Sequence, residues 1–250
     1  MEKVDDVLAD LLSEDIVVIT DRGVRKCRLL HQLKEVWRGA EAVIYRGKLL
    51  DMDVVVKWRF PKPYLPREFD EMMRRKRVID EVKTSLRAYA AGIPVPLPLY
   101  ADADRGVIVF QYIEGEVLRD VVDTLDTPTL CRVCKELGEY LGKLHEIGIV
   151  HGDYTTGNVI VHGERVYIID FGLAMFSKRL DDHAIDVHIF FRSIESTHIG
   201  REETMKKCFI EGYTAIRKDV ARVVLSKVDE IRKWGRYVAE RKLRSVWMGS

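Results

Sequence analysis

Two acids and an amide stand in an order that suits phosphoryl transfer. Asp153 lies in the segment 151–158, which reads HGDYTTGN, and Asp170 begins the tripeptide DFG after an apolar run. Transfer of a phosphoryl group needs a placed nucleophile and cations that hold the phosphates in line. Asp153 can orient or deprotonate an incoming hydroxyl or water, so we predict it as the catalytic residue.

Asn158 and Asp170 have the ligand chemistry that Mg²⁺ prefers. Asn158 offers an uncharged oxygen, and Asp170 offers an anionic oxygen that can bridge the metal to the phosphates. Two short apolar runs, 159–161 and 166–169, lie between them around the turn 162–165. This pattern predicts a β-hairpin, which would bring the two magnesium ligands together.

The elements before these residues read as a small sheet. Strand-like runs at 33–36, 42–45 and 54–58 are separated by glycines, and a buried-type strand follows at 107–110. A long charged helix is expected over 67–91, after three prolines and before Gly92 and Pro94. After about residue 112, helical periodicity dominates, at 130–147, 185–196, 203–217 and 220–242.

The domain boundaries follow from this change of pattern. An N-terminal extension is expected over 1–30, with one helix-like face at 4–12 and an apolar run at 16–19. We then expect a sheet lobe over 31–111 and a mainly helical lobe over 112–250, which ends in a basic tail. The sequence therefore predicts an α+β protein with two lobes.

Lys57 and Glu81 are the expected charged pair of the first lobe. Lys57 ends an apolar run, so its stem would cross a core face while its ammonium could reach a phosphate. Glu81 is the best candidate partner in the charged helix. Glu71 lies near the helix start, and Asp80 points about 100° away around the helix.

The segment 37–43 occupies the place of a phosphate-binding loop. It has one glycine and so fails the G-x-G-x-x-G pattern. Backbone amides at Gly39 and Ala40 can still approach phosphates, because their side chains are absent or small. Glu41 is unusual beside a polyanion unless it makes a structural contact or faces the lysine.

An adenine pocket is expected where the strand 107–110 ends. Phe110 would form its back wall, and the backbone of Gln111 and Ile113 could bond the edge of the base. The first lobe is thus predicted to hold ATP.

The second lobe lacks the parts that ordinary protein kinases use for peptides. Gly152 stands where those enzymes have an arginine that grips a phosphorylated loop. Only 13 residues separate Gly172 from the buried-type acid Asp186, with no A-P-E sequence among them. Switching by that loop and an extended peptide substrate are therefore not expected.

Composition and sequence pattern predict a protein inside the cell. The chain has 250 residues, is 47% hydrophobic and carries a net charge of +1, which excludes whole-molecule attraction to nucleic acid or membrane. It has no apolar run of about 20 residues, and its start lacks the order of a secretory signal. We expect a cytoplasmic protein, also nuclear if eukaryotic, with no membrane partner.

Four cysteines, Cys27, Cys131, Cys134 and Cys208, are too few and too unevenly placed for a disulfide framework. Reduced thiols are therefore expected. The C-x-x-C spacing at 131–134 lies inside a helical pattern with no second pair, so we predict packing in a helix core rather than a zinc or redox site.

The last stretch of the chain is basic. Aromatic residues interleave with its cations, which suits contact with RNA, while a solvated helix end explains the cations equally well. The residues concerned are Arg232, Lys233, Arg236, Arg241, Lys242, Arg244, Trp234, Tyr237 and Trp247.

The motifs described above resemble those of a known family, the small atypical kinases of the KEOPS (EKC) complex. This complex supports threonylcarbamoyladenosine formation in tRNA. The resemblance runs from Gly39 to the C-terminus. It implies a bilobal protein-kinase-like fold with a small antiparallel-sheet N-lobe and a shortened helical C-lobe. It rests on GAEA at 39–42, KWRFPK at 57–62, the helix 74–81, HGDYTTGN at 151–158, IDFGL at 169–173, the segment 182–186 and ESTH at 195–198.

The resemblance also implies roles and partners. Asp153 would be the catalytic acid, Asn158 and Asp170 the magnesium ligands, Lys57 the phosphate lysine and Glu81 its partner. Family members act as ATPases as much as serine/threonine kinases. Their partners would be other KEOPS subunits, above all the tRNA threonylcarbamoyltransferase subunit, and tRNA through the basic tail.

Three alternatives stay open on the sequence. A ribosome-associated RIO kinase is a near relative, and a small-molecule phosphotransferase uses similar H-G-D and D-F-G elements. A nucleotide-binding pseudokinase scaffold is the non-enzymatic alternative, although the residues expected at the active site are all present.

Overall fold

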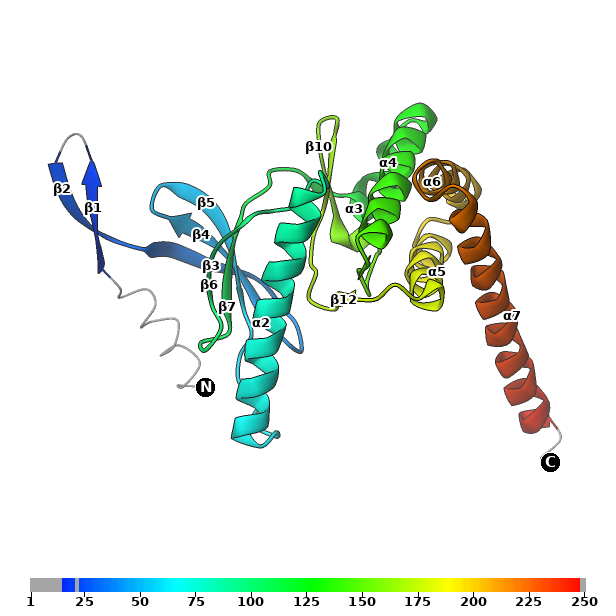
Figure 1. Ribbon diagram of the computed structural model, residues 1–250, viewed down its shortest axis with the longest axis horizontal. Coiled ribbons are helices and arrows are strands. Elements are labelled where there is room, and N and C mark those ends of the chain that lie inside the picture. The colour runs from blue at the N-terminus through cyan, green and yellow to red at the C-terminus, as the bar shows by residue number, and fades with distance from the viewer. Residues whose placement is uncertain (1–14, 21–22, 248–250) are drawn as a thin grey trace. The chain divides into compact units, whose positions relative to one another are not determined.

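The computed structural model describes residues 15–20 and 23–247, and the helix expected over 4–12 lies outside them. The described residues divide into two compact units, which we describe separately (Figure 1). The sheet unit contains the described residues up to 86 together with 96–114. The helical unit contains 87–95 together with the described residues from 115 onward.

A five-stranded antiparallel sheet forms the body of the sheet unit, in the order β3-β4-β5-β7-β6. Val54, Val56 and Trp58 alternate along one face of β5 and are fully buried in the core of this unit. Lys57 projects from the opposite face because successive strand residues point to opposite sides. The strands are β3 Leu30–Arg38, β4 Val43–Leu49, β5 Met52–Trp58, β6 Pro98–Asp102 and β7 Val107–Gln111.

Helix α2 (Arg67–Ala90) follows Pro66, and its last four residues belong to the helical unit. Glu81 and Val78 are buried on one side of α2, while most of its charges are exposed, as a solvated face requires. Before the sheet, β1 (Asp15–Thr20) and β2 (Gly23–Arg28) form an antiparallel hairpin.

Four long helices build the helical unit: α4 (Thr127–Glu146), α5 (Leu180–Thr197), α6 (Glu202–Arg217) and α7 (Asp219–Trp247). Two glycines let α4 and α6 pack closely. A Cβ at Gly138 would lie 2.1 Å from the Phe209 carbonyl oxygen, and one at Gly212 would lie 1.9 Å from that of Lys135. The shorter elements are β8 Glu116–Val117, α3 Leu118–Val121, η1 Val122–Thr124, β9 Ile149–Val150, η2 Thr156–Asn158, β10 Val159–His162, β11 Arg165–Ile168 and β12 Met175–Phe176.

A disulfide joins α4 to α6. Cys131 and Cys208 are bonded, with their Cα atoms 5.2 Å apart, whereas Cys134 is a buried free thiol. The prediction of reduced thiols is therefore wrong for Cys131 and Cys208. The prediction of helix-core packing is right for Cys134. The close approach of the two helices brings together cysteines that are 77 residues apart in sequence.

The predicted fold class is confirmed, since an antiparallel sheet precedes a mainly helical region. The predicted strands and helices are all present within the described residues, with shifted ends. Strands β2 and β6 and the short elements β8, α3, β9 and β12 were not predicted. The domain boundaries at 30/31 and 111/112 stay a prediction. Among the described residues, none of the helices combines the length and apolarity that crossing a bilayer requires.

Candidate active site

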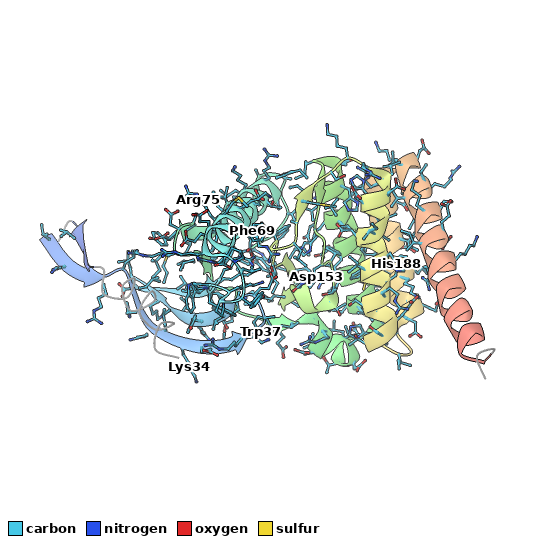
Figure 2. The ribbon with its side chains drawn as sticks, turned by 90° about the horizontal axis from the view of Figure 1, so that it is seen from below. Lys34, Trp37, Phe69, Arg75, Asp153 and His188 are labelled. Carbon is cyan, nitrogen blue, oxygen red and sulfur yellow. A yellow bond between two sulfur atoms is a disulfide. The ribbon has the colours of Figure 1, made fainter. Side chains whose placement is uncertain are left out.

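Asp153 and Asn158 are held together in the helical unit. The Asn158 side-chain amide donates to the backbone oxygen of Asp153 and to its carboxylate Oδ2, both at 2.8 Å. Asn158 ends the short helix η2, and the loop 151–155 before it carries Asp153 (labelled in Figure 2). The two bonds fix the Asp153 carboxylate and direct the Asn158 amide oxygen away from it.

Asp170 lies beside Asn158, as the predicted hairpin requires. Strands β10 and β11 pair from Val159 opposite Ile168, and the Ile169 N–H donates to the Asn158 carbonyl at 3.0 Å. Asp170 adopts a positive φ of 61°, and its carboxylate accepts the Gly172 N–H at 3.0 Å. The hairpin therefore brings together the two residues that were predicted to bind magnesium.

A fully buried acid anchors the loop that carries Asp153. The Asp186 carboxylate accepts the backbone N–H groups of His151 at 2.6 Å and Gly152 at 2.7 Å. The His151 ring in turn lies 3.2 Å from the Ile169 carbonyl. Bonds from backbone amides to a carboxylate are strong when buried, so Asp186 of α5 holds the loop that carries Asp153 in place.

Gly152 is required by its surroundings. Its φ is +80°, and a Cβ would lie 2.5 Å from the Leu173 carbonyl oxygen, so an arginine does not fit here. The segment after Leu173 is short and fastened: β12 pairs with β9, and the Ser177 N–H donates to the Gly148 carbonyl at 2.9 Å. These contacts fasten the short segment to the helical unit.

Sequence reasoning missed the buried histidines behind Asp186. His145 Nε2 lies 3.3 Å from Asp186 and Nδ1 lies 2.8 Å from the Tyr213 hydroxyl, while the His183 ring stacks on His145 at 4.1 Å. Burial lowers the pKa of His145 to about 4, against a smaller upward effect of Asp186. The only sequence signal was a histidine at an apolar position of a helix.

This burial makes the folded state sensitive to acid. Between about pH 6.5 and pH 4 the unfolded chain protonates His145 while the folded chain does not, so stability falls as the pH falls. We expect this histidine alone to remove about 3 kcal/mol of unfolding free energy over that range. Urea unfolding at pH 7 and pH 4 measures it. In the His145→Gln variant the loss should shrink, and an equal loss in both proteins would contradict the assignment.

The sheet unit brings Lys57 and Glu81 together as predicted. Lys57 Nζ lies 2.8 Å from Glu81 Oε1, with both side chains buried. Arg59, which the sequence analysis did not single out, donates to the other oxygen of the same carboxylate at 2.6 Å. Glu81 thus pairs with two cations, Lys57 near the end of β5 and Arg59 just after it. Arg59 binds the carboxylate oxygen that Lys57 does not use.

The loop 39–42 is organised by side chains. The indole of Trp37 lies against the loop, and a Cβ at Gly39 would lie 2.1 Å from that ring, so a larger residue here would displace the indole (Trp37 is labelled in Figure 2). The Gly39 N–H donates to the Ala42 carbonyl at 2.9 Å, so that amide is already used within the loop. Ala40 is exposed.

Glu41 makes the structural contact considered for it. It accepts from Lys62 Nζ at 3.2 Å and from Arg77, and it lies 3.9 Å from Arg59. Through Arg59, the loop is thus connected to the pair of Lys57 and Glu81.

The predicted adenine-binding residues lie at the end of β7. Phe110 is half-buried and Ile113 is buried. The Gln111 N–H donates to the Leu97 carbonyl at 2.8 Å, so this residue would use its carbonyl oxygen toward a base. The contact with adenine stays a prediction for all three residues.

The donor set of the helical unit fits magnesium. Asp170 and Asn158 supply two oxygen ligands, and Mg²⁺ in phosphoryl-transfer sites takes one or two such ligands and completes its shell with phosphates and water. No group of three or more His, Cys, Asp or Glu residues that could cage a metal occurs within 15–20 and 23–247. The residues present therefore suit a metal that arrives with its nucleotide.

Only part of the basic tail can be described. Arg232 forms an ion pair with Glu195 of α5, which also accepts from Lys206 at 2.8 Å, so this cation is engaged within the fold. The side chains from Trp234 onward lie outside the described ones. RNA binding by the tail stays a prediction.

Comparison with known proteins finds relatives over most of the chain. The RIO domain family matches residues 57–193. The chain is 39% identical over 212 residues to "KEOPS complex subunit Bud32" of Pyrococcus abyssi, which covers 82% of this chain and 96% of the relative. It is 37% identical to "Probable serine/threonine-protein kinase BUD32 homolog" of Archaeoglobus fulgidus, with 82% and 96% covered.

Longer relatives match over the same region. The chain is 43% identical to the "Probable bifunctional tRNA threonylcarbamoyladenosine biosynthesis protein" of Methanosarcina acetivorans, with 80% of this chain and 35% of the relative covered, so it spans about a third of that protein. Among solved structures, the Rio2 kinase of Chaetomium thermophilum in a complex with ADP/Mg²⁺-phosphoaspartate is similar, with a TM-score of 0.57. At 17% identity, covering 94% of this chain and 86% of Rio2, this likeness concerns the fold.

Proposed function

Because this chain belongs to the RIO domain family and, within it, to the family of the KEOPS complex subunit Bud32, we propose that it is an ATP- and magnesium-dependent atypical serine/threonine kinase or ATPase of a tRNA-modifying complex. One observation carries the chemistry: in the helical unit Asn158 is bonded directly to Asp153, and the N–H of Ile169, the residue before Asp170, is bonded to the Asn158 carbonyl. We propose the cytoplasm as its location.

Each residue has a defined task in this proposal. Asp153, oriented by the Asn158 amide, positions the attacking hydroxyl or water and accepts its proton. Asn158 and Asp170 hold magnesium, which when bound would neutralise charge on the phosphates. Lys57, aimed by Glu81, binds phosphate oxygens.

The nucleotide base and the loop complete this assignment. Phe110 and the backbone of Gln111 and Ile113 would receive adenine, and the backbone at Gly39 and Ala40 would approach the phosphates. Because the Gly39 amide is bonded to Ala42, Ala40 is the better donor of the two.

The partners follow from the relatives' names. These name a KEOPS complex subunit and tRNA threonylcarbamoyladenosine biosynthesis, so we propose other KEOPS subunits as partners, in particular the tRNA threonylcarbamoyltransferase subunit, and tRNA as a ligand of the assembly. The same names favour a kinase or ATPase of a tRNA-modifying complex over a ribosome-associated kinase or a small-molecule phosphotransferase.

Phosphate release from ATP tests the proposal and separates it from a scaffold without turnover. We expect release by the purified chain with MgCl₂, none with EDTA, and faster release when an unmodified tRNA transcript and the threonylcarbamoyltransferase subunit are added. Nucleotide binding without release under all of these conditions would support the pseudokinase alternative instead.

A further inference from the structure

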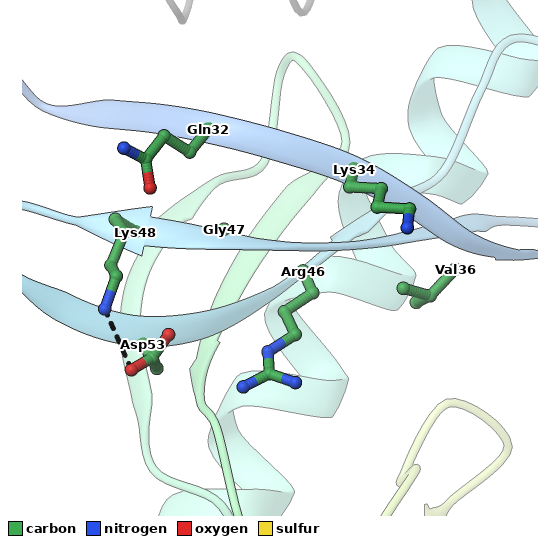
Figure 3. A pocket seen from close by; sticks show the side chains of 7 residues that line it. All are labelled: Gln32, Lys34, Val36, Arg46, Gly47, Lys48 and Asp53. Carbon is green, nitrogen blue, oxygen red and sulfur yellow. Dashed lines mark hydrogen bonds and ion pairs between the residues drawn. The ribbon is translucent and has the colours of Figure 1, made fainter.

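A hollow of about 340 Å³ lies on the sheet unit, and none of the residues assigned to catalysis is among the residues that line it. Figure 3 shows side chains from three neighbouring strands around it: Gln32 and Lys34 from β3, Arg46 and Lys48 from β4, and Asp53 from β5. We call it the basic hollow. Three cations and one acid give it a positive charge.

The cations of the basic hollow stand close together by strand register. Lys34 lies directly opposite Arg46 on the antiparallel neighbour, and Lys48 follows Arg46 two residues on, at a distance of about 7 Å along the strand. Like charges directly opposite each other destabilise a sheet. A pair of like charges that destabilises the sheet and forms no compensating contact is typical of a binding site.

Among the acids that the structure describes, one compensates a cation of the basic hollow. Lys48 pairs with Asp53 at 2.9 Å, and the nearby Glu35 is bonded to Arg38. Among the residues that the structure describes, neither Lys34 nor Arg46 is bonded to an acid. An anionic ligand would relieve their repulsion.

The Arg46 side chain is held in place by a neighbouring aromatic ring. Its guanidinium lies over the Tyr112 ring, 4.0 Å from the centroid. Stacking of this kind orders the side chain before a ligand binds and leaves the planar edge of the guanidinium for two parallel bonds to a phosphate. Gln32 adds an uncharged donor at the rim.

We propose that the basic hollow binds the phosphodiester backbone of RNA. Cations repeated along neighbouring strands suit the repeated charges of a nucleic-acid backbone, and residues 23–50 contain seven lysines and arginines and only two acids. The choice of RNA over another polyanion rests on the proposed function. Among the described residues, no aromatic side chain lines the hollow, so contacts go to phosphates and carry little sequence preference.

The test compares two double variants of equal charge. Lys34→Gln/Lys48→Gln removes two cations of the basic hollow, and Lys76→Gln/Lys83→Gln removes two exposed cations of α2 as the matched control. Binding of a fluorescent unmodified tRNA transcript is measured by anisotropy between 50 and 200 mM KCl.

We expect the hollow variant to bind about tenfold more weakly and its slope of log K against log salt to be shallower by about 1.4 to 1.8. The control variant should behave like the parent. The melting temperature of the hollow variant should stay close to that of the parent, because the relieved repulsion at Arg46 and the lost ion pair between Lys48 and Asp53 oppose each other. An unchanged slope, or a parent that does not bind tRNA, would overturn the proposal.

Two further arms separate other ligands. Poly-glutamate that displaces the transcript at equal charge concentration would assign the hollow to an acidic protein instead. Magnesium-dependent ATP turnover without RNA is measured on the same samples and should not differ between parent and hollow variant. If neither the parent nor the variants turned over ATP, the proposed function would be refuted, while the measured RNA binding would still stand.

Discussion

The Asp153→Asn variant is expected to turn over ATP about 10³-fold more slowly than the parent. The change removes the carboxylate that accepts a proton, but the new amide oxygen can still accept from the Asn158 side chain, and the bond from Asn158 to the backbone oxygen of residue 153 is unaffected. The loss should therefore reflect chemistry and not local structure.

Steady-state phosphate release at saturating Mg-ATP measures this effect. Asp120→Asn, at an exposed acid of the same unit, is the matched control and should keep the parent's rate. The nucleotide affinity and melting temperature of Asp153→Asn should stay close to the parent's values. Turnover at the parent's rate would show that Asp153 is not the catalytic residue.

Removal of the disulfide between Cys131 and Cys208 is expected to lower the free energy of unfolding by roughly 4 kcal/mol. The bond closes a loop between residues that are 77 positions apart, so its loss gives the unfolded chain much more freedom. Unfolding by urea with and without dithiothreitol measures the difference.

The Cys131→Ser/Cys208→Ser variant is the control for this experiment. Its midpoint should match that of the reduced parent and should not respond to dithiothreitol. Titration of thiols in denaturant adds a second measurement: reduction should release two thiols from the parent and none from the variant. A parent that gains no thiols on reduction would contradict the bond.

The periodicity of apolar residues was enough to predict most of the fold, because core-facing residues recur at regular intervals in its strands and helices. The run before Lys57 alternates between core and opposite face, and the charged helix has one buried side that contains Glu81. The hairpin between Asn158 and Asp170 was predictable since both of its strands and its turn have ordinary signals. These local patterns also located most of the candidate site.

Other features depend on contacts between distant parts of the chain. Strand β6 begins with a proline at the sheet edge and alternates only weakly, so its sequence resembles a loop. The partner of Cys131 is decided by the packing of α4 on α6, which no spacing reveals. Arg59 and His145 were missed for the same reason. Each acts through a contact with an acid that is distant in sequence, Arg59 with Glu81 and His145 with Asp186.

The position of Asp186 links two properties that are often separate in enzymes. Its carboxylate is completely buried among core residues, yet it also holds the backbone that carries the proposed base. The core cannot loosen around α5 without releasing the amides of His151 and Gly152. In this protein, heat or denaturant that melts the helical unit should therefore abolish turnover in the same transition, because the loop that carries Asp153 cannot outlast the core around α5.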